Sequence, residues 1–284
     1  ACPASEEWKH IHSGVQDDSA GGGSYMSADL RFGTAFSQLP AGMPPLPNLI
    51  FHKQVGAEIM NKWYQQKGWK IYDIPGGGFH GLPEIWISTN KPITGPNDLK
   101  GLKMRASGDG GKILEAMGVG TVFMPLGEVF EAMQRGVIDA FECSCPAFNY
   151  SMGLQEACKY NYMSPSRAPT EVYGFLVNKD RFAELPAHLQ AVVMECAQAE
   201  SVKYNQMLHS RNAEALVKMA AEGNINAPLP KSIDDAFVAG AKTFYKAEVE
   251  KFPELKEYLA AAMAFAKNWQ ELYGFPYTVM TSFD

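Results

Sequence analysis

The sequence predicts a two-lobed α/β protein on three observations. Short apolar runs alternate with short helical patterns over residues 102–141, which is typical of strands joined by crossover helices. A much longer helical pattern over residues 186–222 is expected to span both lobes. Two more helical patterns, over residues 232–250 and 253–272, are expected to pack outside the lobes.

The first hundred residues give fewer elements. The Gly/Ser stretch at residues 19–24 predicts a loop. A helix is expected over residues 49–67, because Gly68 is suited to the position just after a helix end. Residues 69–74 are predicted to form a strand, which Pro75 and three glycines end.

The middle of the chain predicts a largely parallel sheet. Strands are expected over residues 102–106, 121–124 and 137–141, and helices over 109–117 and 128–135. Gly118 and Gly136 are expected to close these two helices. A further strand over residues 172–178 is expected to run between the lobes.

Apolar residues recur on one face of the pattern at 186–222. They are Leu189, Val192, Val193, Cys196 and Ala199. This spacing predicts a buried helix face, with Cys196 packed in the core.

Composition excludes some classes of partner. The 25 basic and 31 acidic side chains among 284 residues give a net charge of −6, which disfavours a nucleic-acid partner. No apolar run approaches the roughly 18 residues that a membrane-spanning helix needs. Ala1 follows no charged and apolar leader, so we expect a processed or shortened sequence. The five cysteines, Cys2 among them, are too few and too scattered for a disulfide framework.

Arg105 is the leading candidate for binding an anion. It ends the predicted strand at 102–106, and ligands of α/β sheets bind where strands end. Its guanidinium offers parallel donors that match a carboxylate, and a helix start follows directly. A structural salt bridge explains the same residue equally well.

Glu142 ends the next predicted strand, so it and Arg105 are expected to face one cleft. Beside an anion, its carboxylate would need a cation, and Na⁺ or Ca²⁺ held by Glu142 and the backbone carbonyl of Cys143 would supply one. The alternative is a simple ion pair between Glu142 and Arg105.

Two other motifs are candidates for the cleft wall. Cys143 and Cys145 form a C-x-C without the partners of a zinc site, so we expect them to line the pocket, with a redox or metal role as the alternative. The run PGGGFH brings Phe79 and His80 into either a cleft loop or a plain turn. No nucleotide-binding or hydrolase motif is present.

Three segments resemble the solute-binding proteins of tripartite (TRAP) transporters. They are DLKGLKMRASG at 98–108, EAMGVGTVFMPLGEVFEAMQRGVIDAFE at 115–142 and NKDRFAELPAHLQAVV at 178–193. The resemblance implies a periplasmic binding-protein fold of type II-like form, periplasmic localisation and no catalysis. It also implies capture of a small carboxylate by Arg105, lobe closure, and delivery to TRAP membrane subunits.

Within that family, the sequence looks closest to the branch that binds 2-oxo or hydroxy acids with a metal ion. Glu142 matches the metal-binding Glu of that branch, whereas Cys143 stands where Trp is frequent and Cys145 where Asn is common. The C-terminal helices of this branch can form dimers, and a stripe of Leu255, Leu259 and Met263 allows either a homodimer or internal packing.

The expected division gives lobe I residues 1–87 and about 176–230, and lobe II residues 88–175 and about 231–284. Family members usually carry an opening β-α-β-α segment that residues 1–27 are too short to contain. Two other functions stay open: a thiol-dependent enzyme using Cys143 and Cys145, and a ligand-sensing domain of the same fold.

Overall fold

The computed structural model describes residues 6–284 and has two lobes, each built around one sheet. The helices of eight residues or more are α4 (Ala57–Gln66), α5 (Gly108–Ala116), α6 (Leu126–Gln134), α9 (Ala187–Ala221), α10 (Lys231–Glu248) and α11 (Pro253–Leu272). The shorter ones are α1 (Glu7–Ser13), α2 (Gly33–Ser37), α3 (Pro45–Phe51), α7 (Pro146–Ser151) and α8 (Lys179–Glu184). A π-helical stretch, His52–Gly56, joins α3 to α4.

The strands form two sheets. The four-stranded sheet contains β1 (Asp18–Gly22), β2 (Ile71–Asp73), β3 (Phe79–His80) and β9 (Val172–Asn178). Strands β1, β2 and β3 each pair antiparallel with β9. The six-stranded sheet has the order β10 (Ile225–Pro228), β8 (Tyr160–Met163), β4 (Ile85–Thr89), β7 (Ala140–Phe141), β5 (Lys103–Arg105) and β6 (Gly120–Val122). Strands β5, β6 and β7 pair parallel, as do β8 and β10, so the sheet is largely parallel as predicted, and β4 is the one strand that runs antiparallel to its neighbours β7 and β8.

The Gly/Ser stretch predicted as a loop is largely a strand, which corrects that prediction. Residues of β1 pair along β9 from Asp18 opposite Val177 to Gly22 opposite Tyr173. A Cβ at Gly21 would lie only 2.5 Å from the Leu176 side chain. Glycine is therefore used here for close packing within a sheet, which composition alone does not distinguish from a loop.

The alternation at residues 102–141 is confirmed with small shifts. Gly118 and Gly136 adopt positive φ values of 91° and 67° just after α5 and α6, as helix-closing glycines do. Strand β7 is shorter than the predicted strand 137–141. The N–H groups of Val137 and Ile138 donate to the Ala132 carbonyl instead, so these residues close α6 and are unavailable to the sheet.

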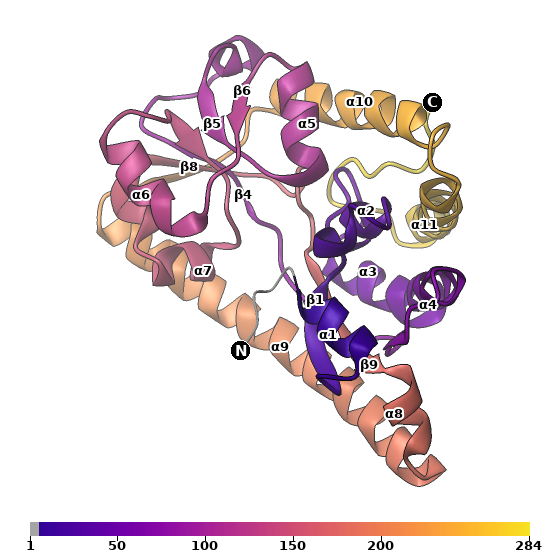
Figure 1. Cartoon of the computed structure of the whole chain (residues 1–284). Coiled ribbons are helices and arrows are strands. Elements are labelled where there is room, and N and C mark those ends of the chain that lie inside the picture. The colour runs from indigo at the N-terminus through magenta and orange to yellow at the C-terminus, as the bar shows by residue number, and fades with distance from the viewer. Residues whose placement is uncertain (1–5) are drawn as a thin grey trace.

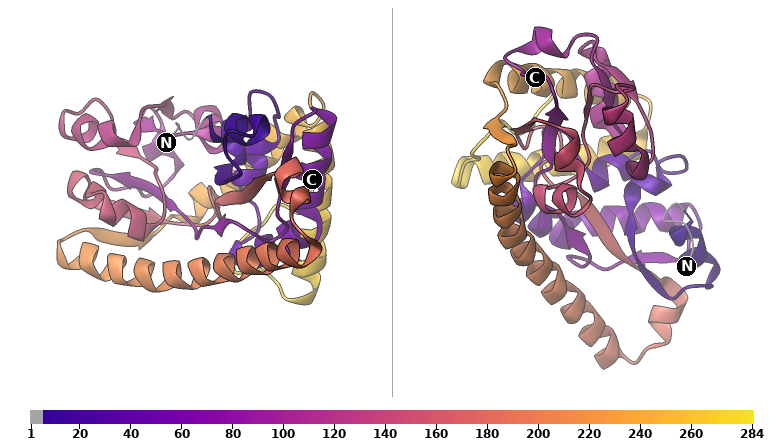
Figure 2. Two further views of the ribbon diagram at one scale, coloured as in Figure 1. Left: turned by 60° about the horizontal axis from the view of Figure 1, so that its bottom comes forward. Right: turned by 90° about the vertical axis from the view of Figure 1, so that its left-hand side faces the viewer.

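Helix α9 runs along both lobes as one unbroken helix (Figures 1 and 2). Its buried residues are Ser201, Leu208, Ala215 and Met219, which run from near the middle of the helix toward its C-terminal end. The apolar face predicted at residues 189–199 is not buried. Leu189 and Val192 are 40% and 53% exposed, and Cys196 is exposed, which corrects its assignment to the core.

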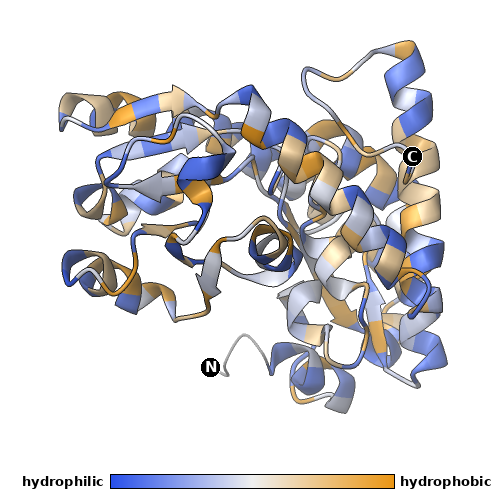
Figure 3. Ribbon diagram, turned by 90° about the horizontal axis from the view of Figure 1, so that it is seen from above, coloured by the Kyte–Doolittle hydropathy of each residue, from blue (hydrophilic) through white to orange (hydrophobic). Residues whose placement is uncertain are grey.

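Helices α10 and α11 pack against lobe elements through a shared core. Figure 3 shows that the helices of this protein carry both hydrophobic and hydrophilic residues, as expected where one helix face is buried. Leu255, Leu259 and Met263 are at most 8% exposed and belong to this core. The stripe is therefore internal packing and is not available as the dimer surface considered above. Among residues 6–284, no helix has both the length and the apolar character to cross a membrane.

The sheets refine the expected division of the chain. The expected division placed β10 and most of β4 in lobe I, but both strands belong to the six-stranded sheet. It placed most of β9 in lobe II, but β9 is the central strand of the four-stranded sheet.

Candidate functional site

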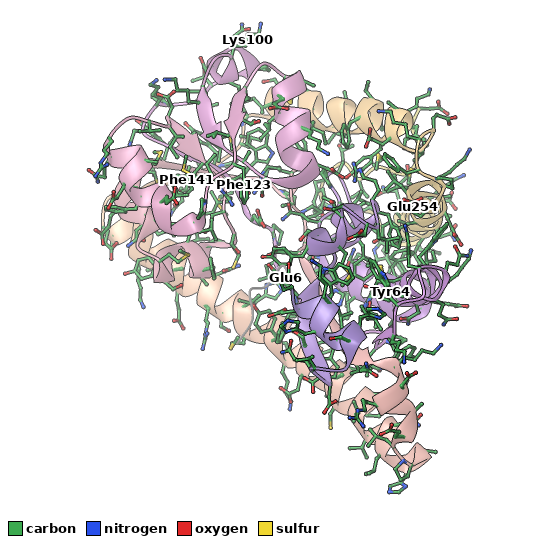
Figure 4. The ribbon with its side chains drawn as sticks, in the orientation of Figure 1. Glu6, Tyr64, Lys100, Phe123, Phe141 and Glu254 are labelled. Atoms are coloured by element: carbon green, nitrogen blue, oxygen red, sulfur yellow. The ribbon has the colours of Figure 1, made fainter. Side chains whose placement is uncertain are left out.

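A cavity of about 1130 Å³ lies between the two sheets and is closed along one side by α9. The parallel strands β5, β6 and β7 end at one edge of their sheet, and the residues that follow them line the cavity. Among these is Phe123, which Figure 4 labels on the lobe of the six-stranded sheet. The opposite wall comes from the β1–α2 region, β3 and β9.

Arg105 lines the cavity although its side chain is only 7% exposed. Its Nη1 donates to the Glu142 carbonyl oxygen at 2.7 Å and to Oε1 of Glu142 at 3.1 Å. Its Nε makes a longer contact of 3.4 Å with the Met124 carbonyl, and its guanidinium carbon lies 5.8 Å from the Phe123 ring centre. Nη2 has no hydrogen-bond partner among the described residues. The guanidinium is thus held firmly and retains one donor group on the cavity wall.

Glu142 lies beside Arg105 as the strand order predicts, but behind the wall. It is 2% exposed and is not among the residues that line the cavity. Besides Arg105, its Oε1 accepts from Ser107 Oγ at 3.1 Å, and its Oε2 lies 2.9 Å from Arg167 Nη1. Glu142 therefore serves in this conformation as a buried counter-ion, the ion-pair alternative considered above.

Two further members of this charge cluster were not predicted from the sequence. Arg167, 1% exposed, lies 2.5 Å from Glu84 Oε2, and Gln38 donates to Glu84 Oε1 at 2.6 Å. Burial raises the pKa of Glu84 to about 8, and the adjacent guanidinium of Arg167 opposes this rise. Arg167 stands alone between two small residues in SPSRAP, so no spacing in the sequence indicates its role.

Both predicted cysteines line the cavity, as expected for pocket walls. Burial, together with the neighbouring carboxylates of Glu142 and Glu84, raises the pKa of Cys143 to about 12. Burial also raises the pKa of Cys145. Such thiols stay protonated and are poor nucleophiles, which counts against the thiol-enzyme alternative. Cys2 lies outside the described residues.

Of the two candidates in the PGGGFH run, Phe79 lies on the cavity wall and His80 in the protein interior. Phe79 lines the cavity and contacts Tyr204 of α9, with ring centres 4.6 Å apart. His80 is completely buried against His52, and burial lowers its pKa well below the usual value. His80 is therefore placed behind the wall and away from any ligand, because alternate residues of β3 point to opposite sides.

The remaining wall carries polar groups of both signs. Glu171 accepts from the Tyr173 hydroxyl at 3.0 Å, and burial raises the pKa of its carboxyl. On α9, Arg211 and Lys218 line the cavity seven residues apart, so they lie on one helix face. This periodicity is visible in the sequence, but only the packing of α9 shows which face meets the cavity.

Glu142, the side chain predicted to hold a cation, is already engaged by protein donors. Among the described residues, no group of three or more His, Cys, Asp or Glu side chains is placed to hold a metal. The side-chain and backbone oxygens of Glu142 all lie within 3.1 Å of a guanidinium nitrogen or the Ser107 hydroxyl. A cation at Glu142 would therefore have to displace these groups.

Comparison with known proteins gives a family. A model described as bacterial extracellular solute-binding protein, family 7, matches residues 48–251. A monocarboxylate 2-oxoacid-binding periplasmic protein of Nostoc is 27% identical over 198 residues, which are 70% of this chain and 54% of the relative. A C4-dicarboxylate-binding periplasmic protein of Rhodobacter capsulatus is 34% identical over 142 residues, 48% of this chain and 41% of the relative. The chain thus spans about half the length of these relatives.

Solved structures agree in fold. A TRAP solute-binding protein of Colwellia psychrerythraea with bound calcium and pyruvate superposes with a TM-score of 0.82 at 23% identity, covering 94% of this chain and 82% of that one. One from Bordetella bronchiseptica, a dimer with calcium and picolinate, gives 0.81 at 22% identity, with 95% and 81% covered. Because the family model covers well over half of the sequence, the chain belongs to family 7 of the bacterial extracellular solute-binding proteins, a family of receptors and not of enzymes, and it has the two-lobed fold of TRAP solute-binding proteins.

Proposed function

We propose that this chain is the periplasmic solute-binding subunit of a TRAP transporter and captures a small organic acid, a 2-oxo or hydroxy monocarboxylate. The 2-oxoacid-binding relative from Nostoc supports this ligand class, and neighbours of the same fold hold pyruvate or picolinate. Its partners are then the membrane subunits of the transporter, to which the ligand is delivered without any bond being made or broken.

The observation that carries the proposal is the free donor of Arg105. Glu142 and Met124 hold Nη1 and Nε, while Nη2 lacks a protein partner among residues 6–284. A guanidinium stays charged when desolvated, so its remaining N–H groups are suited to a ligand carboxylate. Phe123 beside it offers an apolar surface to the rest of a small ligand.

Lobe closure is the second part of the proposal. A cavity of about 1130 Å³ is far larger than a three- or four-carbon acid requires. Movement of the lobes toward each other would bring the β1–α2 wall against a ligand on Arg105. Closure removes water from the ion pair, which strengthens it because the local dielectric constant falls.

Isothermal titration calorimetry with the full chain tests this function. A panel of 2-oxo, hydroxy and dicarboxylic acids should yield at least one ligand of micromolar affinity. Arg105→Met should lose about 2–4 kcal/mol of binding free energy, roughly a 30- to 1000-fold weaker Kd, because the ligand carboxylate loses its charge partner.

The matched control is Arg135→Met. Arg135 forms an exposed ion pair with Glu131 on α6, outside the cavity, and its replacement should leave the Kd unchanged. Circular dichroism would show that both variants remain folded. Unchanged affinity in Arg105→Met would remove the assignment of this residue, and failure of every organic acid to bind would remove the ligand class.

A further inference from the structure

Arg167 lies between two buried carboxylates at the back of the cavity wall. Its Nη2 is 2.5 Å from Glu84 Oε2, and its Nη1 is 2.9 Å from Glu142 Oε2. The second contact lacks hydrogen-bond geometry, so it acts through charge. All three residues are at most 3% exposed.

The guanidinium is fixed from several sides. Nε donates to the Trp86 carbonyl and Nη2 to the Ile85 carbonyl, both at 3.2 Å. A Cβ on Gly110 of α5 would lie 3.2 Å from Cγ of Arg167, so the absence of a side chain there leaves room for the arginine stem. The position is therefore built around this side chain.

The cluster needs no added cation. Arg105 and Arg167 supply two positive charges, and Glu84 and Glu142 supply at most two negative ones, because burial raises the pKa of Glu84 to about 8. Calcium would need six to eight oxygen ligands at about 2.3–2.6 Å. Here the Glu142 oxygens already face guanidinium nitrogens and the Ser107 hydroxyl.

We propose that Arg167 occupies the place of a cation between Glu84 and Glu142, so that this site binds its organic acid without a metal ion. The second half of this statement rests on the proposed function, whereas the first half concerns the protein alone. Solved neighbours of the same fold hold calcium or sodium together with pyruvate, whereas in this chain an arginine lies between the two buried carboxylates.

The test measures cation binding without any organic ligand. Thermal unfolding of the full chain is followed in EDTA and in about 5 mM CaCl₂, a concentration above the Kd of most calcium sites, at matched ionic strength. Wild type should show no specific rise in Tm. Arg167→Met should unfold at lower temperature in EDTA, and Ca²⁺ should raise its Tm by about 4 °C, because Glu84 then lacks its counter-ion and Glu142 keeps only Arg105.

Arg167→Lys is the matched control, since it keeps a positive charge and should not respond to Ca²⁺. A calcium-dependent rise in wild type that Glu142→Gln abolishes would overturn the proposal. So would an Arg167→Met protein that gains nothing from Ca²⁺, or one that stays unfolded with and without the ion. Failure of organic acids to bind would refute the proposed function and leave these results unaffected.

Discussion

The reactivity of Cys143 separates a binding protein from a thiol enzyme, and its magnitude follows from the structure. The thiol lies on the cavity wall beside buried carboxylates, and burial is the main cause that raises its pKa to about 12. At pH 8 that value leaves about 1 in 10⁴ thiols ionised, against roughly one in four for an ordinary thiol of pKa about 8.5. Because only the thiolate is alkylated, we expect Cys143 to react about three orders of magnitude more slowly.

Iodoacetamide labelling followed by peptide mass spectrometry measures this rate for each cysteine separately. Cys196 is exposed and provides an internal comparison in the same sample. The Cys143 rate should rise about tenfold per pH unit from pH 7 to 10 without a plateau, since the ionised fraction grows throughout this range. In denaturant the two cysteines should react alike.

The refuting result is equally specific. Cys143 labelled as fast as Cys196 at pH 7, or a rate that reaches a plateau below pH 9, would mean an activated thiolate. The electrostatic account of the cavity wall would then be mistaken, and a thiol-dependent reaction would again need consideration.

Three other predictions concern folding stability, measured as the free energy of unfolding in urea. Gly78→Ala should lower the free energy of unfolding by more than about 3 kcal/mol, because at φ 85° the added Cβ would collide with a backbone carbonyl of the neighbouring strand. The control is Gly68→Ala, at φ 72° with no atom nearby, which should cost only about 1 kcal/mol. Equal losses would contradict the collision. Asp109→Asn should cost about 2–4 kcal/mol, because both carboxylate oxygens of buried Asp109 pair with Arg31, at 2.9 and 3.2 Å. A loss below about 1 kcal/mol, the effect of an exposed ion pair, would contradict this. Burial raises the pKa of Glu84 from about 4.5 to about 8, so between these pH values the folded state holds a proton that the unfolded chain releases. The contribution of this carboxyl to stability should therefore fall as the pH rises from about 4.5 to about 8. Glu84→Gln should flatten this pH dependence, and an unchanged slope would assign it to other groups.

Local patterns were sufficient for many elements. Strand β9 and helix α11 have the predicted limits, because an apolar run or an initial proline marks them within a few residues of sequence. Gly118 and Gly136 close their helices for the same local reason. The prediction failed where glycines serve packing, as in β1, and where the apolar residues near the start of α9 face solvent.

The candidate site shows the same division. Parallel strands end at a common edge, so the sequence could bring Arg105 and Glu142 together, and it marked the C-x-C segment as part of the wall. It could not show that Glu142 is withdrawn behind that wall or that His80 points away from it. These outcomes depend on which face of each element meets the other lobe.

The sequence by itself determined the fold class, the family resemblance and the position of Arg105 at a strand end, because each depends on residues close together in the chain. Only the tertiary structure decided the charge balance around that arginine. Arg167 is 83 residues from Glu84 in the sequence, and it meets Glu84 and Glu142 only because it packs against β4 of the six-stranded sheet, next to β7. Whether a buried charge needs a metal ion depends on which opposite charge the fold places beside it, and no local spacing records that choice.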